Sequence, residues 1–465
     1  MRTASVSDRT PRNPDPQKKP DKVRQVAYKV IRQVTSESGY ANLVLNKALR
    51  DARLAGRDAA FCTELVHGTL RWQGTYDAFL ARCVDRPLNE IDPELLDVLT
   101  LGTHQLLRMR VDSYAAVDEM VTLTRVMLGH KRSGLVNAVL RKVSQRTFDQ
   151  WIETVAPPIE ENRLLHLAVA KAHPTWVIDA FADLLGDGDE LEDLLDANNE
   201  PARVTLVARP GLATIDELIE AGASRAKYSP YAAILESGGD PGRIAAVATG
   251  RAGVQDEGSQ LVALALANAP IEGSDTAWLD LCAGPGGKSA LLAALVEERD
   301  GALTAVEPLE HRAELVRANL RAIPGDHQVI VGDGTKPTWE EGSFDRVLAD
   351  VPCSGLGALR RRPEARWRRT PEDIEELRPL QEDLLDAAIN SVRPGGVVGY
   401  VTCSPHHDET RAVVDTVLGR RDDATLEDAR ELFPDVPELG AGPDVQLWPH
   451  RQGTDAMYLA LIRRS

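Results

Sequence analysis

Short apolar runs alternate with longer segments of helical periodicity from about residue 250 to the end of the chain. Five runs have the length and composition of buried strands, at residues 278–281, 303–306, 328–331, 346–349 and 397–401. Parallel strands that are covered on both faces need helical crossovers between them, because a tight turn cannot return the chain to the same end of a sheet. The alternation therefore predicts an α/β domain with a doubly wound sheet over residues 250–465.

The front of the chain has a different pattern, which is helical almost throughout residues 21–150. Asp92 is followed by Pro93, the order expected of an N-cap residue and the first helical position. Leu95 and Leu99 then fall on one face of the same helix. We therefore expect an all-α domain here, and a multidomain chain, as a length of 465 residues also indicates.

Two further segments complete the predicted organisation. Residues 1–20 carry several prolines among charged residues and too little apolar material to offset the entropy of ordering, which predicts a disordered tail. Residues 160–248 follow an acidic boundary that contains two prolines, and they combine helical stretches with a short strand at 203–208. This composition predicts a small α/β middle module.

Composition limits the classes of function. The formal net charge of −17 opposes general attraction to nucleic acid, so any RNA site must be a local basic patch. No apolar run is long enough to span a membrane and the first twenty residues hold no signal-peptide stretch, so we expect a cytoplasmic protein. The five cysteines are widely spaced without a C-x-x-C pair, which favours free thiols over a disulfide framework or a metal site.

A glycine-rich loop follows the first expected strand of the α/β domain. Its residues are Cys282, Ala283, Gly284, Pro285, Gly286, Gly287 and Lys288. Glycines at a strand-to-helix turn let the backbone approach a ligand, and the helix N-terminus offers free N–H groups to a carboxylate or phosphate. The spacing fits neither the dinucleotide G-x-G-x-x-G motif nor the Walker G-x-x-x-x-G-K-[ST] motif, so neither NAD nor ATP is the expected ligand.

Acidic residues stand where the next three expected strands end. Glu307 closes the second strand, Asp333 follows the third and Asp350 ends the fourth. Ligands of open α/β sheets bind at the carboxyl ends of the strands, where a carboxylate about twenty residues past the loop can accept both ribose hydroxyls. A single acid at a strand end is usually a solvated turn residue or a helix cap, but three in step with the loop predict one ligand crevice.

Three motifs together resemble the RsmB/Fmu branch of the RNA cytosine-C5 methyltransferases. They are the glycine-rich loop after Asp280-Leu281, the Pro-Cys motif Asp350-Val351-Pro352-Cys353 and the Thr-Cys motif Thr402-Cys403-Ser404. The front domain resembles the NusB-type RNA-binding helical domain of this branch, most clearly at residues 133–141. The resemblance covers nearly all of the chain, and its pairing of a Pro-Cys with a Thr-Cys motif is highly specific.

The resemblance implies a Rossmann-like domain that uses S-adenosyl-L-methionine to methylate carbon 5 of a cytosine in RNA, with 16S ribosomal RNA as the expected substrate. Carbon 5 is too weakly nucleophilic to take a methyl group directly, so a thiolate first adds to carbon 6. By the family's motifs, Cys403 attacks and Cys353 assists release, while an acid such as Asp350 could stabilise the adduct at ring N3. The cofactor would lie against residues 282–288, Glu307, Asp333 and Asp350.

The chain departs from the family pattern at a few positions. Gly284 stands where the family often has Ala, Glu307 where it often has Asp, and Thr410 where Asn is expected. The longer carboxylate can still reach ribose hydroxyls. His406 and His407 follow the Thr-Cys motif, but we interpret them as a loop beside the site, because no third metal ligand lies at a recognisable spacing.

An arginine cluster follows the Pro-Cys motif. It contains Arg360, Arg361, Arg362, Arg366, Arg368 and Arg369 around Trp367. Charge runs are usually solvated faces, but this one stands in an acidic chain beside a catalytic motif, and arginines with an aromatic ring suit phosphates and a stacked base. We therefore expect Arg360, Arg361, Arg362, Arg366 and Trp367 to contact RNA.

Alternatives remain open at this point. A non-catalytic NusB-like RNA-binding or antitermination factor could keep the fold, although the presence of both thiols and all three acids disfavours it. Transfer RNA or DNA could replace ribosomal RNA as the substrate, and a DNA-type mechanism would make Cys353 the nucleophile. The front domain favours ribosomal RNA by family analogy, free or in an assembling small subunit. No metal is expected, and the oligomeric state is left open.

Overall fold

A computed structural model describes residues 19–37, 39–236 and 239–465. The chain forms two compact units, Met1–Pro174 and Thr175–Ser465, and each is described here by itself. The expected disordered tail, residues 1–20, lies outside the described residues except for its last two. The further division at residues 150, 160 and 248 stays a prediction.

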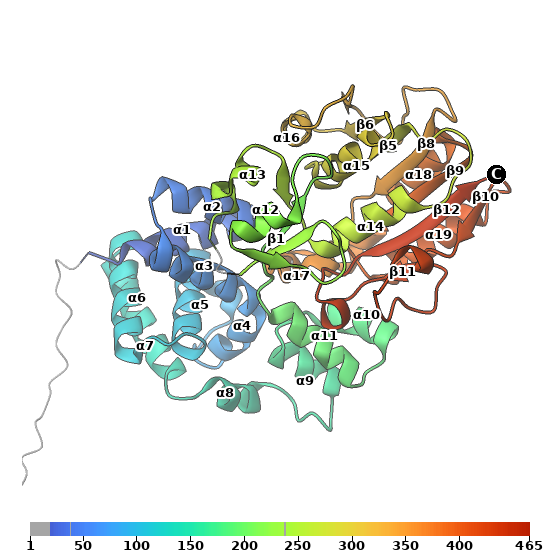
Figure 1. Ribbon diagram of the computed structural model, residues 1–465. Coiled ribbons are helices and arrows are strands. Elements are labelled where there is room, and N and C mark those ends of the chain that lie inside the picture. Colours follow the sequence, from blue (N-terminus) through green and yellow to red (C-terminus); the bar gives the residue numbers. More distant parts are fainter. Residues whose placement is uncertain (1–18, 38, 237–238) are drawn as a thin grey trace, which may run out of the picture. The chain divides into compact units, whose positions relative to one another are not determined.

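The described residues of the first unit form helices and no strand, which confirms the expected fold of the front of the chain (Figure 1). Its α-helices are α1 (Lys22–Glu37), α2 (Ala41–Asp51), α3 (Gly56–Arg71), α4 (Gln73–Ala81), α5 (Pro93–Leu107), α6 (Ser113–Met127), α7 (Ser133–Val143), α8 (Phe148–Val155) and α9 (Arg163–Ala170). Asp92 caps α5 by accepting the N–H of Glu94 at 3.1 Å. A Cβ at Gly102 would meet Leu140 of α7 at 2.6 Å, so the glycine lets these two helices pack closely.

The second unit begins with two helices and a small antiparallel sheet. The helices are α10 (Thr175–Leu185) and α11 (Asp189–Asn199). The sheet has the order β2 (Ala223–Arg225), β3 (Ala232–Leu235), β1 (Thr205–Ala208) and β4 (Ala252–Val254). The short helices α12 (Ile215–Glu220) and α13 (Ala245–Ala248) pack on it around Leu206 and Leu218. The expected strand at 203–208 thus belongs to a four-stranded sheet.

An eight-stranded sheet forms the rest of this unit and contains all five strands expected from the sequence. Its order is β10 (Ala424–Glu427), β12 (Tyr458–Arg464), β9 (Val392–Thr402), β8 (Phe344–Asp350), β5 (Ala277–Asp280), β6 (Ala302–Glu307) and β7 (Gln328–Val331), with β11 (Val445–Gln446) beside β12. The strands from β9 to β7 are parallel, whereas β12 and β10 are antiparallel additions at one edge. The expected doubly wound α/β sheet is confirmed.

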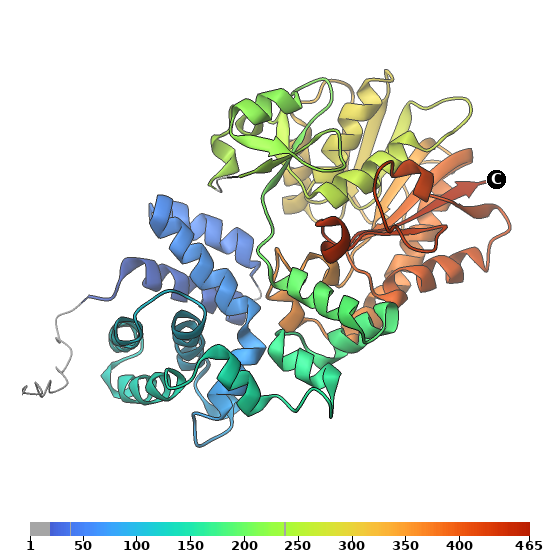
Figure 2. The ribbon, with the colours of Figure 1, turned by 60° about the horizontal axis from the view of Figure 1, so that its bottom comes forward.

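Helices cover both faces of this sheet (Figures 1 and 2). Trp278 points into one core with α14 (Glu257–Asn268), α15 (Gly287–Glu297) and α16 (Glu310–Leu320). Its neighbour Leu279 points into the other core with α18 (Pro371–Ser391) and α19 (Arg411–Leu418). Side chains alternate along a strand, so the two cores lie on opposite faces. No helix of the described residues is long and apolar enough to cross a membrane.

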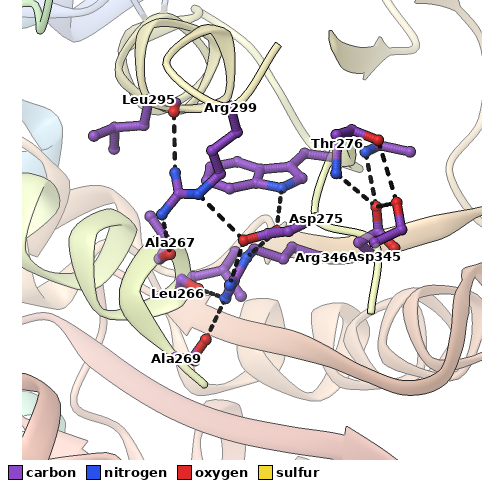
Figure 3. Close-up of polar contacts among 12 residues, drawn as sticks. Leu266, Ala267, Ala269, Asp275, Thr276, Leu295, Arg299, Asp345 and Arg346 are labelled. Carbon is purple, nitrogen blue, oxygen red and sulfur yellow. Dashed lines mark hydrogen bonds and ion pairs between the residues drawn. The ribbon is translucent and has the colours of Figure 1, made fainter. Parts of the chain in front are cut away.

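The amino ends of β5 and β8 are fixed by buried polar contacts (Figure 3). Arg346 of β8 donates to both carboxylate oxygens of Asp275 at 2.7 and 2.8 Å, and to the carbonyls of Leu266 and Ala269 at 2.7 Å each. Asp345 accepts two backbone N–H groups at 2.8 and 2.9 Å. These contacts satisfy most of the donors of the buried Arg346 and fix this end of the sheet to the segment that precedes β5. The opposite ends of the strands carry the candidate site.

Candidate active site

The glycine-rich loop joins β5 to α15 at the carboxyl edge of the sheet. Gly286 has φ of +104°, a left-handed conformation that favours glycine, and a Cβ there would meet the Cα of Val316 at 2.9 Å. The helix then begins at Gly287, so its first N–H groups face the loop. Below the loop, Asp280 accepts the hydroxyl of Ser289 at 2.6 Å, and burial raises the pKa of Asp280 to about 7.

Glu307, at the end of β6, lies against the glycine-rich loop. Its side chain is 2% exposed, and its Oε1 accepts the N–H of Leu309 at 3.1 Å. A Cβ on Gly284 would come within 2.0 Å of Glu307 Oε2, so the missing side chain at 284 makes room for this carboxylate. Arg312 donates to the carbonyl of Gly284 at 2.6 Å and lies 3.5 Å from Glu307 Oε2. A carboxylate beside bare backbone fits a nucleoside cofactor, whose ribose hydroxyls need an acceptor.

The other two expected acids differ in their surroundings. Asp350 ends β8 and forms an ion pair with Lys288 of the loop at 2.9 Å. Burial lowers the pKa of Lys288, but the charge and hydrogen bond of Asp350 outweigh that effect and raise it. Asp333 lies in the turn after β7, where hydrogen bonds from Thr335 and Lys336 lower its pKa. The side chain of Asp333 is thus 44% exposed in a turn. Glu307 instead lies beside Gly284 of the loop, and Asp350 forms its ion pair with Lys288 of the loop.

The two thiols of the Pro-Cys and Thr-Cys motifs meet at the ends of neighbouring strands. Cys353 follows β8 and Cys403 follows β9, and these strands are parallel, with Asp350 paired to Val401. The two Sγ atoms lie 3.4 Å apart. A Cβ at Gly357 would come within 2.1 Å of the Ala456 carbonyl, so this glycine lets its loop pack closely beside the thiols.

The surroundings of the two thiols favour different protonation states. The hydrogen bond with Cys353 lowers the pKa of Cys403, and the positive charges of Arg362 and Lys288 lower it further. Burial and the negative charge of Asp350 oppose this shift without reversing it. The same hydrogen bond, together with burial, raises the pKa of Cys353 well above its ordinary value. This geometry therefore favours a Cys403 thiolate that accepts a hydrogen bond from the Cys353 thiol, and a thiolate is the nucleophilic form of cysteine.

Sequence reasoning missed several residues around these motifs. Arg312 reads as an ordinary helix residue, and Gln381 of α18 and Glu409 of the 3-10 turn His407–Glu409 read as surface positions. Glu409 is fully buried and accepts hydrogen bonds from Ser354 and Gln381. The sequence signal for Glu409 was the acidic pair Asp408-Glu409 in the segment after Cys403.

His406, in the same segment, accepts the N–H of Asp408 at 3.2 Å. The described residues contain no cluster suited to a metal ion.

Much of the arginine cluster is engaged within the protein. Arg361 bridges Asp256 and Asp455, whose side chains are nearly buried, and Arg360 donates to the carbonyl of Gly453 at 2.9 Å. Arg366 is fully buried and donates to the side chain of Asn199 at 2.8 Å and the carbonyl of Asn198 at 3.1 Å. A guanidinium already bound by protein groups is poorly placed to bind phosphate. These bonds within the protein make Arg360, Arg361 and Arg366 the weakest candidates for contact with RNA.

The other two predicted RNA-binding residues are more accessible, since Arg362 is exposed and Trp367 is half-buried. Contact with RNA stays a prediction for all five residues.

Comparison with known proteins adds to this geometry. The family model described as 16S rRNA methyltransferase RsmB/F matches residues 265–463, and the NusB family model matches residues 21–145. A Mycobacterium tuberculosis relative named as a methyltransferase is 50% identical over 98% of this chain and 99% of its own length. Ribosomal RNA small subunit methyltransferase B of Vibrio cholerae is 30% identical over 95% of this chain and 97% of its own length.

Solved structures agree with the fold. The crystal structure of a protein designated PH0851 has a TM-score of 0.80 at 21% identity and covers 95% of this chain and 98% of its own. NSun6 from Pyrococcus horikoshii, solved with SFG, has a TM-score of 0.53 at 19% identity and covers 63% of this chain and 99% of its own. At these identities the likeness concerns the fold alone. With the two family models and the relatives that span nearly the whole chain, the sequence belongs to the RsmB/F family of 16S rRNA methyltransferases and carries a NusB-family domain at its front.

Proposed function

We propose that this RNA methyltransferase modifies carbon 5 of a cytosine in 16S ribosomal RNA, through a covalent bond between Cys403 and carbon 6 of the base. The observation that carries the proposal is the approach of two thiols to 3.4 Å at adjacent strand ends. A methyltransferase that acts on a ribose hydroxyl or an exocyclic amine needs no thiol pair at this place. A non-catalytic RNA-binding factor would have no use for one thiol poised as a thiolate and a second poised as its proton donor.

The cofactor is S-adenosylmethionine, which supplies the methyl group as an electrophilic sulfonium when it is bound. The residues proposed to hold it are 282–288, Glu307, Asp333 and Asp350. Glu307 would accept ribose hydroxyls, because it lies buried beside bare backbone at Gly284. Asp333, whose side chain is more exposed, would contact the cofactor from the solvent side. The ion pair of Lys288 with Asp350 would fix the loop against the thiol side of the site.

Cys403 would begin the reaction from its thiolate form. Its sulfur adds to carbon 6, the electron pair of the 5,6 double bond shifts to the 4,5 position, and the pair of the 3,4 double bond moves to ring N3. The product is an enamine with a nucleophilic carbon 5. Ring N3 takes up a proton in this step, and Asp350, at the end of β8 with Lys288 as its hydrogen-bond partner, would accept a hydrogen bond from the N3–H group. The protein thereby turns an unreactive carbon into one that can accept a methyl group.

Cys353 would act in the last step, when the bond between Cys403 and carbon 6 breaks. Water acting as the base takes the proton from carbon 5, the electron pair of that C–H bond re-forms the 5,6 double bond, and the sulfur of Cys403 leaves with the electron pair of the broken C6–S bond. A thiol at 3.4 Å that keeps its own proton can donate a hydrogen bond to the leaving sulfur. This role explains why the second cysteine is useful in a site with one nucleophile.

Replacing each thiol separates attack from release. Cys403→Ala should form no covalent complex and transfer no methyl group. In Cys353→Ala, Cys403 should still attack the base, and a protein–RNA complex that survives a denaturing gel should accumulate. This complex should disappear when Cys403 is also replaced. The reverse pattern would assign attack to Cys353, and full activity in both variants would refute thiol catalysis.

The finer choice of substrate is also part of the proposal. The matched family and its Vibrio cholerae member are named for ribosomal RNA of the small subunit, which supports 16S RNA as the substrate. We propose that the protein acts on it in the cytoplasm, free or in an assembling subunit. Bisulfite sequencing of ribosomal and transfer RNA, from cells with and without this protein, tests it. Loss of a 5-methylcytosine in 16S RNA is expected, and loss only in transfer RNA would favour the alternative substrate.

A further inference from the structure

Glu409, in the 3-10 turn after Cys403, is a fully buried acid that bonds to Ser354, the residue next to Cys353. Its carboxylate accepts the N–H of Ser354 at 2.7 Å, the Nε2 of Gln381 at 3.2 Å and the hydroxyl of Ser354. Within the described ranges, no lysine or arginine forms an ion pair with it. Removing the hydrogen bonds of a buried carboxylate is costly, so this cluster holds its members firmly.

The bonds of this cluster fall on both sides of Cys353. Ser354 follows the thiol and is bound by Glu409, while Pro352 precedes it and its carbonyl accepts Gln381 Nε2 at 2.8 Å. Because Gln381 also donates to Glu409, the two residues form one clamp around the backbone of Cys353.

The clamp also touches the backbone neighbour of Cys403, because the Ser354 hydroxyl donates to the hydroxyl of Ser404 at 3.1 Å. Cys403 nevertheless depends less on the clamp than Cys353 does. It directly follows β9, whose residue Val401 is paired with Asp350 in the sheet, and its carbonyl accepts the N–H of Gly357 at 2.9 Å. Cys353 instead lies three residues beyond the end of β8, outside the sheet pairing. Loss of the clamp should therefore displace Cys353 more than Cys403.

We propose that Glu409 is a positioning residue that holds Cys353 against Cys403, so that its removal impairs release of the methylated base more than attack on it. This inference rests on the proposed roles of the two thiols. The negative charge of Glu409 also helps to raise the pKa of Cys353, after the effects of Cys403 and burial, and so favours the proton that release requires.

The test compares Glu409→Ala, Glu409→Gln and Cys353→Ala under turnover with RNA and S-adenosylmethionine. Glu409→Ala should lower kcat by up to about a hundredfold, the cost of displacing a reacting group by about 1 Å, with little change in KM for RNA. It should also accumulate the covalent protein–RNA complex, as Cys353→Ala does. Glu409→Gln keeps an acceptor for the Ser354 N–H and should recover much of the rate and less of the complex.

Asp345→Ala is the matched control, because Asp345 is a buried acid at the other end of β8 that accepts two backbone N–H groups. It should lower thermal stability without accumulating the complex. If Cys353→Ala accumulates the complex and folded Glu409→Ala does not, the positioning role is wrong and the proposed function stands. If neither accumulates it, the release role of Cys353 fails and the inference fails with it.

Gln381→Ala gives the answer should Glu409→Ala not fold. It removes the bond to Pro352 and leaves the carboxylate bound to Ser354. Accumulation of the covalent complex in this variant supports the clamp. Its absence, while Cys353→Ala accumulates the complex, overturns the inference.

Discussion

At the scale of single residues, position alone gives two identical side chains different chemistry. Cys353 and Cys403 lie 3.4 Å apart, yet the pKa of one is raised and that of the other lowered. Both cysteines could be identified from the sequence by their motifs. Their unequal acidity could not, because it depends first on the hydrogen bond between the two thiols, and then on burial and on charged neighbours such as Arg362 and Lys288, all of which are set by the fold.

The thiol environments predict the order in which an alkylating agent reacts. As pH rises from the acid side, the group with the lowered pKa ionises first, so iodoacetamide near neutral pH should modify Cys403 before Cys353. Cys353→Ala removes the hydrogen bond that lowers the pKa of Cys403, and should shift the reaction of Cys403 to higher pH. Alkylation rates against pH, measured by peptide mass spectrometry, test this.

Cys62 serves as the control. Burial raises the pKa of Cys62 to about 12, so Cys62 should stay unmodified in the folded protein. Faster reaction at Cys353 would reverse the assignment.

Gly284 and Glu307, two departures from the family pattern, are linked by space. An alanine at 284 would place its Cβ 2.0 Å from Glu307 Oε2, so the carboxylate would have to move. Such crowding typically costs about 1–3 kcal/mol, so Gly284→Ala should weaken S-adenosylmethionine binding by about fivefold to a hundredfold. Adding Glu307→Asp shortens the acid and should restore much of the affinity. Calorimetry measures both, and a double variant no better than the single one would show that the two residues are independent.

At the scale of elements, the sequence predicts what local pattern encodes. The five parallel strands, the cap at Asp92 and the loop before α15 were all expected, because burial period, capping chemistry and glycine spacing are local. The edge strands β10 and β11 and the partners of the arginine cluster were not. Arg361 is bound by Asp256 and Asp455, which lie about a hundred residues away in each direction along the chain. A charge run therefore shows how many cations a segment has, and not which of them are already paired.

Arg361 and Arg362 should thus behave differently when replaced. Arg361→Ala leaves Asp256 and Asp455 without their shared partner and should lower the free energy of unfolding by about 3 kcal/mol, the usual effect of breaking a buried ion pair. Arg362 is exposed, so Arg362→Ala should cost less stability than Arg361→Ala and should reduce the salt slope of RNA binding by about 1. Thermal unfolding and binding at several salt concentrations distinguish them. A reduced salt slope with unchanged stability for Arg361→Ala would restore it to the RNA surface.

At the scale of the whole molecule, the chain combines two units that each have their own core. The front unit packs residues such as Phe79 and Trp151, and the larger unit packs separate clusters on the two faces of its sheet. We therefore expect residues 175–465 alone to bind S-adenosylmethionine as the full chain does, and to bind 16S RNA more weakly. Calorimetry and RNA titration of the two proteins measure this. Equal RNA affinity would show that the NusB-family domain is not needed for RNA binding.

The most direct measurement is the identity of the methylated nucleoside. The purified protein is incubated with unmodified 16S RNA and S-adenosylmethionine that carries an isotopically labelled methyl group, and the RNA is then digested and separated by mass spectrometry. We expect the label in 5-methylcytidine with the wild-type protein, and no labelled nucleoside with Cys403→Ala. Label in another nucleoside or on ribose, or undiminished 5-methylcytidine with Cys403→Ala, would contradict methylation of cytosine through this thiol.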